Sequence, residues 1–306
     1  WADVLSSFSS GFGDTDMIHV MGNHEYEGNS DGSFGRALNM LPDEKYYSVT
    51  YGSVYVAVIN YQYTNNAARI QEAVSWLIED AKESDAIWKI LVMHQPPYYT
   101  NPTGGNSYAN TYIPAAVDEA GIDFVFSGHD HAYARTQPMT GGAVDNENGA
   151  VYIISGSTGE KSYDVILSES NHYAVATNDY TSIYLSVEAT GTTFTVTAYN
   201  VVNGEAQIFD TYTMTKDNEC ASSGHDYCYN DGYLTCLACG YTYKMPDDFS
   251  GMVKHESGLN MMFSNGQPQE NQWVNVGDNL YYFGEGGIAA DGKVENVDNG
   301  YGDLFW

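Results

Sequence analysis

The segment from Ile122 to Tyr133 constrains the fold more than any other stretch of the chain. An apolar run, Ile122–Ser127, ends at Gly128, and His129 and His131 follow two positions apart. Such a run closed by glycine predicts a buried strand and a tight turn where the backbone approaches a ligand closely. Residues two apart in an extended chain face the same side, so both imidazoles are expected in one cleft. A pair of ordinary loop histidines would have the same spacing.

Two earlier apolar runs are also predicted to be strands that end in polar groups. Asp16–Met21 leads into Gly22-Asn23-His24-Glu25, and Ile87–Met93 leads to His94. The prolines that follow His94 cannot continue a sheet. Taken singly, the first of these motifs is explained at least as well by a turn, and the second by a structural histidine.

The order of the predicted elements favours an α/β fold. A hairpin is expected over Tyr46–Asn60, helices over Asn65–Ser84 and Ile113–Ala120, a strand over Ala150–Ser155, and an antiparallel meander over Ser182–Thr215. Strands alternating with helices predict a sheet flanked by helices. Ligands gather at the carboxyl ends of the strands in such sheets. Four nitrogen or oxygen ligands would lie at that edge and favour a metal site: Asn23, His94, His129 and His131.

The charge of the chain narrows the classes of partner. The sequence carries 11 Lys and Arg residues against 40 Asp and Glu residues, a formal net charge of −29. Such a balance argues against nucleic acid or an anionic membrane as the main partner. The sequence contains no stretch of about 18 apolar residues, so no membrane-spanning segment is expected. Abundant Tyr and Gly with scarce Lys indicate an extracellular or cell-wall associated protein.

Three motifs together resemble those of the calcineurin-like metallophosphoesterases, in particular the purple acid phosphatase-like branch. They are Gly22-Asn23-His24-Glu25, Val92-Met93-His94 and Gly128-His129-Asp130-His131-Ala132-Tyr133-Ala134-Arg135-Thr136. Their order, their spacing and the strand expected before each are similar to the family pattern. The resemblance covers about residues 1–216. It implies a metallophosphoesterase fold, with sheets flanked by helices, and hydrolysis of phosphate mono- or diesters as the activity.

The resemblance also implies roles for individual residues. In that family two metal ions, commonly iron, zinc or manganese, share a bridging carboxylate and hydroxide. Asn23, His94 and His129 would bind one metal ion, and His131 would bind the other. His24 would lie by the leaving group as a general acid or transition-state donor. Two cations neutralise phosphoryl oxygens and lower the pKa of bound water, so that hydroxide is available for attack.

The family pattern begins with two motifs that we do not find here. They carry an Asp with a nearby Asp or His and then a Gly-Asp pair, and they precede the motif that contains Asn23. Gly13-Asp14 lies only nine residues before Asn23, and we interpret Asp14 as a turn residue. We therefore expect a domain incomplete at its N-terminus, completed by a missing N-terminal segment or a partner chain. The alternative is a non-catalytic extracellular surface or assembly protein that uses this fold as a scaffold.

A small module is expected over residues 217–247, where all four cysteines lie. Cys236 and Cys239 form a C-x-x-C turn suited to zinc, and Cys220 with His225 would complete a tetrahedral structural site. A tetrathiolate that uses Cys228 is a close variant, and two disulfides are the alternative in an oxidising setting. The turn resembles the small zinc-ribbon modules of bacterial surface proteins. Either cross-link would replace a core that so short a segment cannot build.

Residues 248–306 are expected to form a tail rich in aromatic residues and glycine. The stretch Trp273–Gly284 resembles a cell-wall or glucan-binding repeat, with a tryptophan, a Tyr-Tyr-Phe strand and glycine turns. Aromatic faces of this kind stack on cell-wall glycan or choline, and they also simply hold a hairpin together. The tail thus predicts a β-hairpin that contacts a cell wall, after the metallophosphoesterase domain and the small module.

Overall fold

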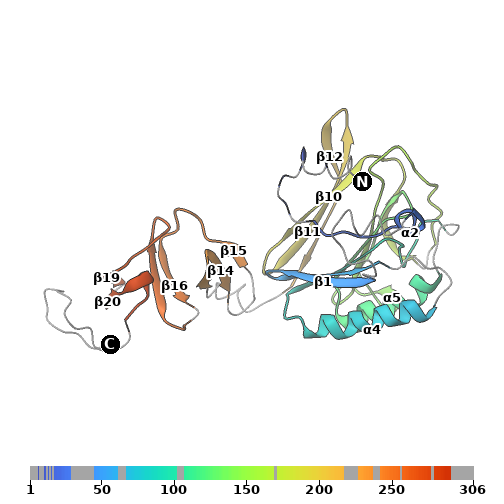
Figure 1. The fold of residues 1–306 in the computed structure, drawn as a ribbon. Coiled ribbons are helices and arrows are strands. Elements are labelled where there is room, and N and C mark those ends of the chain that lie inside the picture. Colours follow the sequence, from blue (N-terminus) through green and yellow to red (C-terminus); the bar gives the residue numbers. More distant parts are fainter. Residues whose placement is uncertain are drawn as a thin grey trace. The chain divides into compact units, whose positions relative to one another are not determined.

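The computed structural model divides the chain into two compact units. The first comprises Trp1–Ala189 and Thr193–Thr215, and the second Thr190–Thr192 and Lys216–Trp306. Figure 1 shows the ribbon of both. The structure describes residues 6, 10–11, 13, 15, 17–28, 45–60, 67–101, 107–168, 171–216, 227–236, 242–255, 257–276 and 279–290. Each unit is treated by itself below.

A mixed sheet of seven described strands forms the centre of the first unit. In spatial order they are β1 (Tyr46–Tyr51), β2 (Val54–Ile59), β3 (Trp88–Met93), β4 (Phe124–Ser127), β8 (Val151–Ser155), β5 (Tyr133–Thr136) and β9 (Tyr173–Thr177). Strands β2, β3, β4 and β8 are parallel. The strands β1, β5 and β9 pair antiparallel to their neighbours. Parallel neighbours bring their carboxyl ends to one edge, and the predicted hairpin over Tyr46–Asn60 is confirmed.

Both faces of this sheet are buried, and successive residues of one strand enter different cores. On β3, Trp88 and Ile90 pack into one hydrophobic cluster, and Leu91 and Met93 pack into another. Side chains alternate across a strand, so an uninterrupted apolar run is what a sheet covered on both faces requires. The predicted strand over Ile87–Met93 is confirmed.

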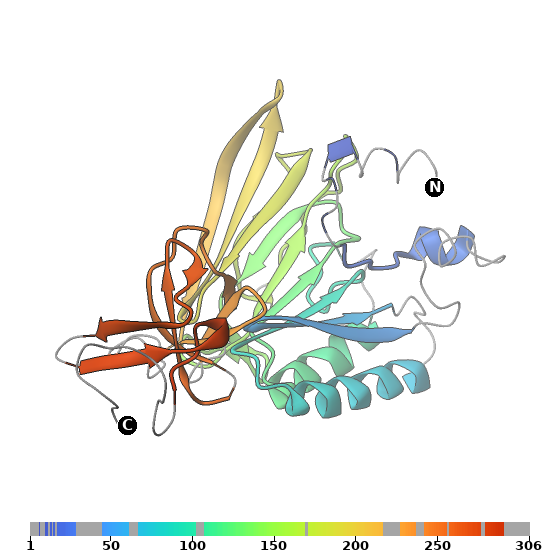
Figure 2. The same cartoon turned by 60° about the vertical axis from the view of Figure 1, so that its left-hand side comes forward.

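A second, three-stranded antiparallel sheet covers one face of the large sheet. It contains β10 (Ile183–Ala189), β11 (Thr193–Val202) and β12 (Glu205–Thr215), which confirms the predicted meander. Phe194 on β11 is fully buried and stacks on Phe124 of β4, with ring centroids 4.4 Å apart. Figure 2 shows these long strands rising beside the large sheet. Two further short strands, β6 (Met139–Thr140) and β7 (Ala143–Val144), pair with each other.

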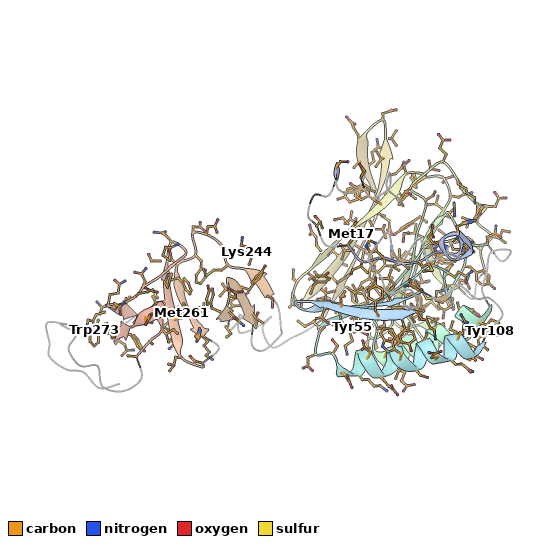
Figure 3. The ribbon with its side chains drawn as sticks, in the orientation of Figure 1. Met17, Tyr55, Tyr108, Lys244, Met261 and Trp273 are labelled. Carbon is orange, nitrogen blue, oxygen red and sulfur yellow. The ribbon has the colours of Figure 1, made fainter. Side chains whose placement is uncertain are left out.

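Two helices cover the other face of the large sheet (Figure 1). Helix α4 (Ala67–Glu83) buries Ile70, Ala73, Leu77 and Ala81, four of the five residues of the predicted apolar stripe. Tyr55, labelled in Figure 3, lies on the sheet beneath this helix, and its hydroxyl donates to Asp80 at 2.6 Å. The burial of the stripe is the physical reason that these residues form a helix here.

Helix α5 (Ser107–Ala120) begins six residues earlier than predicted, so Pro114 lies inside it rather than in its first turn. Proline removes one backbone donor and normally breaks a helix. Ala109 and Ile113 before the proline and Val117 after it are all fully buried, so the apolar face continues across the proline. Burial of that face thus outweighs the local preference.

The predicted strand over Asp16–Met21 is wrong, because residues 17–22 are in no strand. Their backbone groups bond to side chains instead of to a neighbouring strand. The Tyr47 hydroxyl donates to the His19 carbonyl at 2.7 Å and lies 3.0 Å from the His19 amide. The Met21 amide donates to Asn60 Oδ1 at 2.8 Å. These side chains tie the segment to the first hairpin without a ladder.

The second unit contains a six-stranded sheet. Its order is β15 (Thr242–Lys244), β14 (Tyr233–Cys236), β13 (Tyr227–Asn230), β16 (Gly251–His255), β17 (Asn260–Ser264) and β18 (Gln267–Pro268). Leu234, Val253, Met261 and Phe263 form its small core, and Met261 is labelled in Figure 3. Because β13 pairs with β16, strands on both sides of the expected boundary at residues 247 and 248 share this sheet.

A separate hairpin follows, made of β19 (Gln272–Val276) and β20 (Asn279–Phe283), before the short helix η2 (Glu285–Gly287). The predicted hairpin is therefore confirmed. Trp273 packs on Tyr282 across it, with ring centroids 5.2 Å apart. None of the helices that the structure describes is long and apolar enough to cross a membrane. The sheets and flanking helices of the first unit, followed by small β modules, match the predicted fold class.

Candidate metal centre

Three predicted ligands meet at the carboxyl edge of the large sheet. Asn23 is the first residue of helix α2 (Asn23–Gly28), His94 directly follows β3, and His129 follows β4 by two residues. His94 Nε2 lies 2.9 Å from Asn23 Oδ1, and His129 Nδ1 lies 3.2 Å from the same oxygen. The two ring nitrogens lie 3.2 Å apart. Residues 71 and 106 positions apart in sequence thus form one triangle of donor atoms.

The size of this triangle fits a metal ion. With metal–ligand bonds of about 2.1 Å, neighbouring ligand atoms lie about 3.0 Å apart in an octahedral site and about 3.4 Å apart in a tetrahedral one. The observed separations between the three ligand atoms, 2.9, 3.2 and 3.2 Å, are close to these values. An amide oxygen with two imidazoles suits borderline metals such as zinc, iron or manganese. The described residues hold no group of three or more His, Cys, Asp or Glu side chains placed to bind a metal, and in this triangle the third donor is the amide oxygen of Asn23.

The electrostatics keep the central imidazole in its ligating form. Burial, and after it the neighbouring His129, His131 and His24, together lower the pKa of His94 to about 4. A buried ring cannot carry a charge cheaply, and nearby imidazoles oppose a second positive charge. His94 is therefore neutral near pH 7, with a nitrogen lone pair available for a metal.

The turn that carries His129 and His131 has an unusual backbone. His129 and His131 both have a left-handed backbone conformation, with φ of 71° and 50° respectively. Positive φ is uncommon outside glycine and is retained where surrounding contacts enforce it, as in functional sites. The Gly128 amide donates to the His94 carbonyl at 2.9 Å and so joins two of the ligand-bearing segments.

Gly22 makes the close approach of the first segment to His94 feasible. A Cβ atom at this position would lie 2.6 Å from Glu25 Oε2 and 3.2 Å from His94 Cε1. The Gly22 amide donates to the same Glu25 oxygen at 3.0 Å. A methyl group here would move the Glu25 carboxylate and press the His94 ring outward by a few tenths of an ångström. The absence of a side chain therefore allows His94 its observed position.

His131 lies close to the triangle but is not part of it. Its ring packs against Tyr163 with centroids 4.8 Å apart. Burial lowers the pKa of His131, with further lowering by Lys161, His129 and His24. Its Nδ1 atom is buried without a hydrogen-bond partner in the described part of the chain. A buried nitrogen of this kind needs an explanation, and a metal ion would supply one.

His24 neighbours Asn23 on α2, and its side chain is exposed. It acts on the pKa values of both His94 and His131, which puts it near both rings. The structure therefore gathers the predicted residues of the first unit: Asn23, His24, His94, His129 and His131.

The second predicted site is described only in part. Cys220, His225 and Cys239 lie outside the described residues. Cys236 is buried at the end of β14, and Cys228 is half-buried on β13. The prediction of structural zinc against disulfides stays a prediction.

Sequence patterns did not assign a role to Asp130 or to Tyr163, which both contact the histidine turn or its supports. Tyr133 and Arg135 belong to the same sequence motif as the two histidines. Their side chains bond to Asp210 of β12, at 2.6 Å from the Tyr133 hydroxyl and 2.7 Å from Arg135 Nε. The pairing spans 75 residues or more, so no local signal identifies it.

Comparison with known proteins agrees with these motifs. The chain is 29% identical over 162 residues to purple acid phosphatase 23 of Arabidopsis thaliana, covering 46% of this chain and 33% of that protein. It is 30% identical over 123 residues to purple acid phosphatase 18 of the same plant, covering 38% and 27%. The chain thus spans about a third or less of the length of these relatives.

Among solved structures, purple acid phosphatase PPD1 from yellow lupin (Lupinus luteus) seeds superposes with a TM-score of 0.49 at 16% identity. That superposition covers 58% of this chain and 34% of the lupin protein. Residues 2–133 match the family model described as calcineurin-like phosphoesterase. The matched region thus includes all five predicted site residues of the first unit and ends at Tyr133, just after the histidine turn.

Proposed function

We propose that this protein is a phosphoric ester hydrolase, a phosphomonoesterase or phosphodiesterase that uses a dimetal centre. The observation that carries the proposal is the triangle formed by Asn23 Oδ1, His94 Nε2 and His129 Nδ1, with sides of 2.9 to 3.2 Å. The match of residues 2–133 to the calcineurin-like phosphoesterase model supports the same activity.

The residues divide the work between them. Asn23, His94 and His129 would hold one metal ion, and His131, whose Nδ1 atom has no other described partner, would hold the second. Bound metal ions would neutralise phosphoryl oxygens and lower the pKa of water. His24 is exposed beside Asn23, and its ring would donate a proton to the leaving oxygen of a bound substrate.

The bridging carboxylate and the other ligands of the second metal would come from outside the described residues. Two sources fit this proposal, a further N-terminal segment and a partner chain. Asp130 Oδ2 accepts from Thr100 and Glu25 Oε2 accepts from Gly22, whereas Asp130 Oδ1 is buried without a hydrogen-bond partner in the described part of the chain.

We also propose that the protein works outside the cell, in contact with a cell wall. The acidic composition and the hairpin with its Trp273–Tyr282 contact support this. Cosedimentation with purified cell-wall glycan tests it, with Trp273→Ala and the exposed Tyr233→Ala as a matched pair. Equal retention of both variants and the parent would refute a role for Trp273.

We also propose a structural zinc ion in the module of Cys220, His225, Cys236 and Cys239. Replacing Cys236 by serine should lower the measured zinc content of the protein by about one equivalent.

The main experiment measures metal content and hydrolysis of p-nitrophenyl phosphate and bis-p-nitrophenyl phosphate. His94→Ala and His129→Ala should each lower metal content and abolish activity. His255→Ala is the control, because His255 lies in the second unit and bonds to Ser257. Equal metal content in all three variants would refute the site.

Metal binding without hydrolysis of either ester, in this chain and in a form extended at its N-terminal side, would refute the enzyme. The scaffold alternative would then hold. Activity in the extended form alone would show that the remaining ligands come from the added segment.

A further inference from the structure

The residue between the two histidines, Asp130, ties their turn to the segment that follows β3. Its side chain is 1% exposed. Its Oδ2 atom accepts hydrogen bonds from the Thr100 amide at 2.6 Å, the Thr100 hydroxyl at 2.9 Å and the Asn101 amide at 3.3 Å. A buried carboxylate with three donors is a strong, directional anchor. Thr100 and Asn101 therefore fix the left-handed turn through these hydrogen bonds to Asp130.

Thr100 and Asn101 in turn hold a second segment. The Ile166 amide donates to the Thr100 carbonyl at 2.8 Å, and Asn101 Nδ2 donates to the Asp164 carbonyl at 3.0 Å. These two hydrogen bonds fix the backbone of residues 164–166, which lie more than sixty positions away in sequence. Tyr163 directly precedes this segment.

The aromatic ring of Tyr163 contacts the ring of His131. Its ring lies 4.8 Å from the His131 ring at an angle of 35°, and the Lys161 ammonium lies 5.0 Å from the same tyrosine ring. The Tyr163 carbonyl accepts from Asn178 Nδ2 at 3.0 Å. The contacts therefore run from Asp130 through Thr100 and the 164–166 backbone back to His131.

A metal-binding histidine usually has its second ring nitrogen held by a hydrogen bond, which fixes tautomer and orientation. In the described part of the chain, His131 Nδ1 is buried without a hydrogen-bond partner. The orientation of the ring therefore depends on its contact with Tyr163 and on the anchoring of the turn by Asp130.

We propose that Asp130 and Tyr163 are positioning residues that hold the His131 ring in its observed orientation. The consequence for metal binding rests on the proposed function, whereas the orientation of the ring does not. The contacts that hold the ring and its turn are all made by residues of this chain. Such preorganisation of a ligand lowers the entropy lost on binding.

The test compares Tyr163→Phe with Tyr163→Leu in the full chain without metal. Long-range proton–nitrogen NMR of the histidine rings reports how many orientations the His131 ring adopts. We expect a single set of His131 ring signals in the parent and in Tyr163→Phe, because no contact of the described structure uses the tyrosine hydroxyl. Tyr163→Leu should give broadened or doubled signals, because the ring contact is lost. An unfolding curve for each variant checks that the domain remains folded.

The same comparison at Asp130 uses Asp130→Asn, which keeps an acceptor for Thr100, and Asp130→Leu, which removes it. Zn²⁺ affinity measured by competition with a chelator should be about 10 to 100-fold weaker for the two leucine variants than for Tyr163→Phe and Asp130→Asn. An unchanged His131 spectrum in Tyr163→Leu, or equal effects of Phe and Leu, would overturn the proposal. Absence of hydrolysis in every form would refute the enzyme and leave the NMR result standing.

Discussion

Replacing Asp210 by alanine is expected to cost the first unit about 3 to 5 kcal/mol of unfolding free energy. Asp210 makes bonds of 2.7 and 3.0 Å to Arg135, and the Tyr133 hydroxyl donates to it at 2.6 Å. The Arg135 and Asp210 side chains are only 10% and 9% exposed. Without the carboxylate, a buried guanidinium and a buried hydroxyl lose their partner, and solvent cannot replace it.

The assay is unfolding by urea and by heat, followed by the near-ultraviolet signal. A loss of this size should lower the melting temperature of a unit of this length by about 10 °C. The control is Glu119→Ala, which removes the ion pair between Lys82 Nζ and Glu119 Oε1 at 2.9 Å. The Lys82 side chain is 54% exposed and the Glu119 side chain 59%. That change should cost less than about 1 kcal/mol. Equal costs for the two variants would refute the argument that burial decides the strength of the pair.

The pH dependence of this pair follows from its pKa shift. Burial alone would raise the pKa of Asp210, but the hydrogen bonds from Arg135 and Tyr133 outweigh it, and the pKa is lowered. The carboxylate therefore stabilises the fold fully above its unfolded pKa of about 3.9, and this contribution is lost as the pH falls through the lower folded value.

Three further outcomes are expected. In metal-free protein, His94 binds a proton less readily folded than unfolded, because its pKa is lowered to about 4. Stability should thus fall by up to about 3 kcal/mol as the pH falls from about 6.5 to about 4, and urea unfolding of His94→Gln should show a flatter profile. Gly22→Ala should weaken Zn²⁺ binding about tenfold, whereas Gly11→Ala, where no atom lies within 4 Å, should not; equal binding by calorimetry would contradict the packing argument. Leu77→Ala should cost about 2 to 5 kcal/mol in urea unfolding, because Leu77 is fully buried, and a cost below about 1 kcal/mol would show that α4 packs loosely.

Local periodicity was sufficient for the elements with strong patterns. The apolar run of β3, the hairpin of β1 and β2 and the stripe of α4 were all predicted where the structure has them. His94 and His129 were expected at one edge for a related reason, because each follows a strand whose carboxyl end lies there. Asn23 was expected beside them after a strand that the structure does not contain, and Asn23 reaches them from the start of α2 instead. In these cases a residue's neighbours in sequence already determine its burial.

The errors have the opposite cause. Residues 17–22 have the composition of a strand, yet the Tyr47 hydroxyl and the Asn60 amide group satisfy their backbone groups, and both lie more than 25 residues away. Pro114 was assigned to a helix start, and only the packing of Ala109 and Ile113 showed that the helix continues through it.

The sequence by itself determined the sheet with its flanking helices and the candidate ligands Asn23, His94 and His129, because these follow from alternation, from helical spacing and from the chemistry of side chains. Only the tertiary structure decided what supports His131. Asp130, Thr100 and Tyr163 lie 30 or more residues apart in sequence, and they meet through hydrogen bonds and a ring contact. Such contacts leave no periodic signal, since they depend on how loops pack on the sheet rather than on the conformation of any one segment.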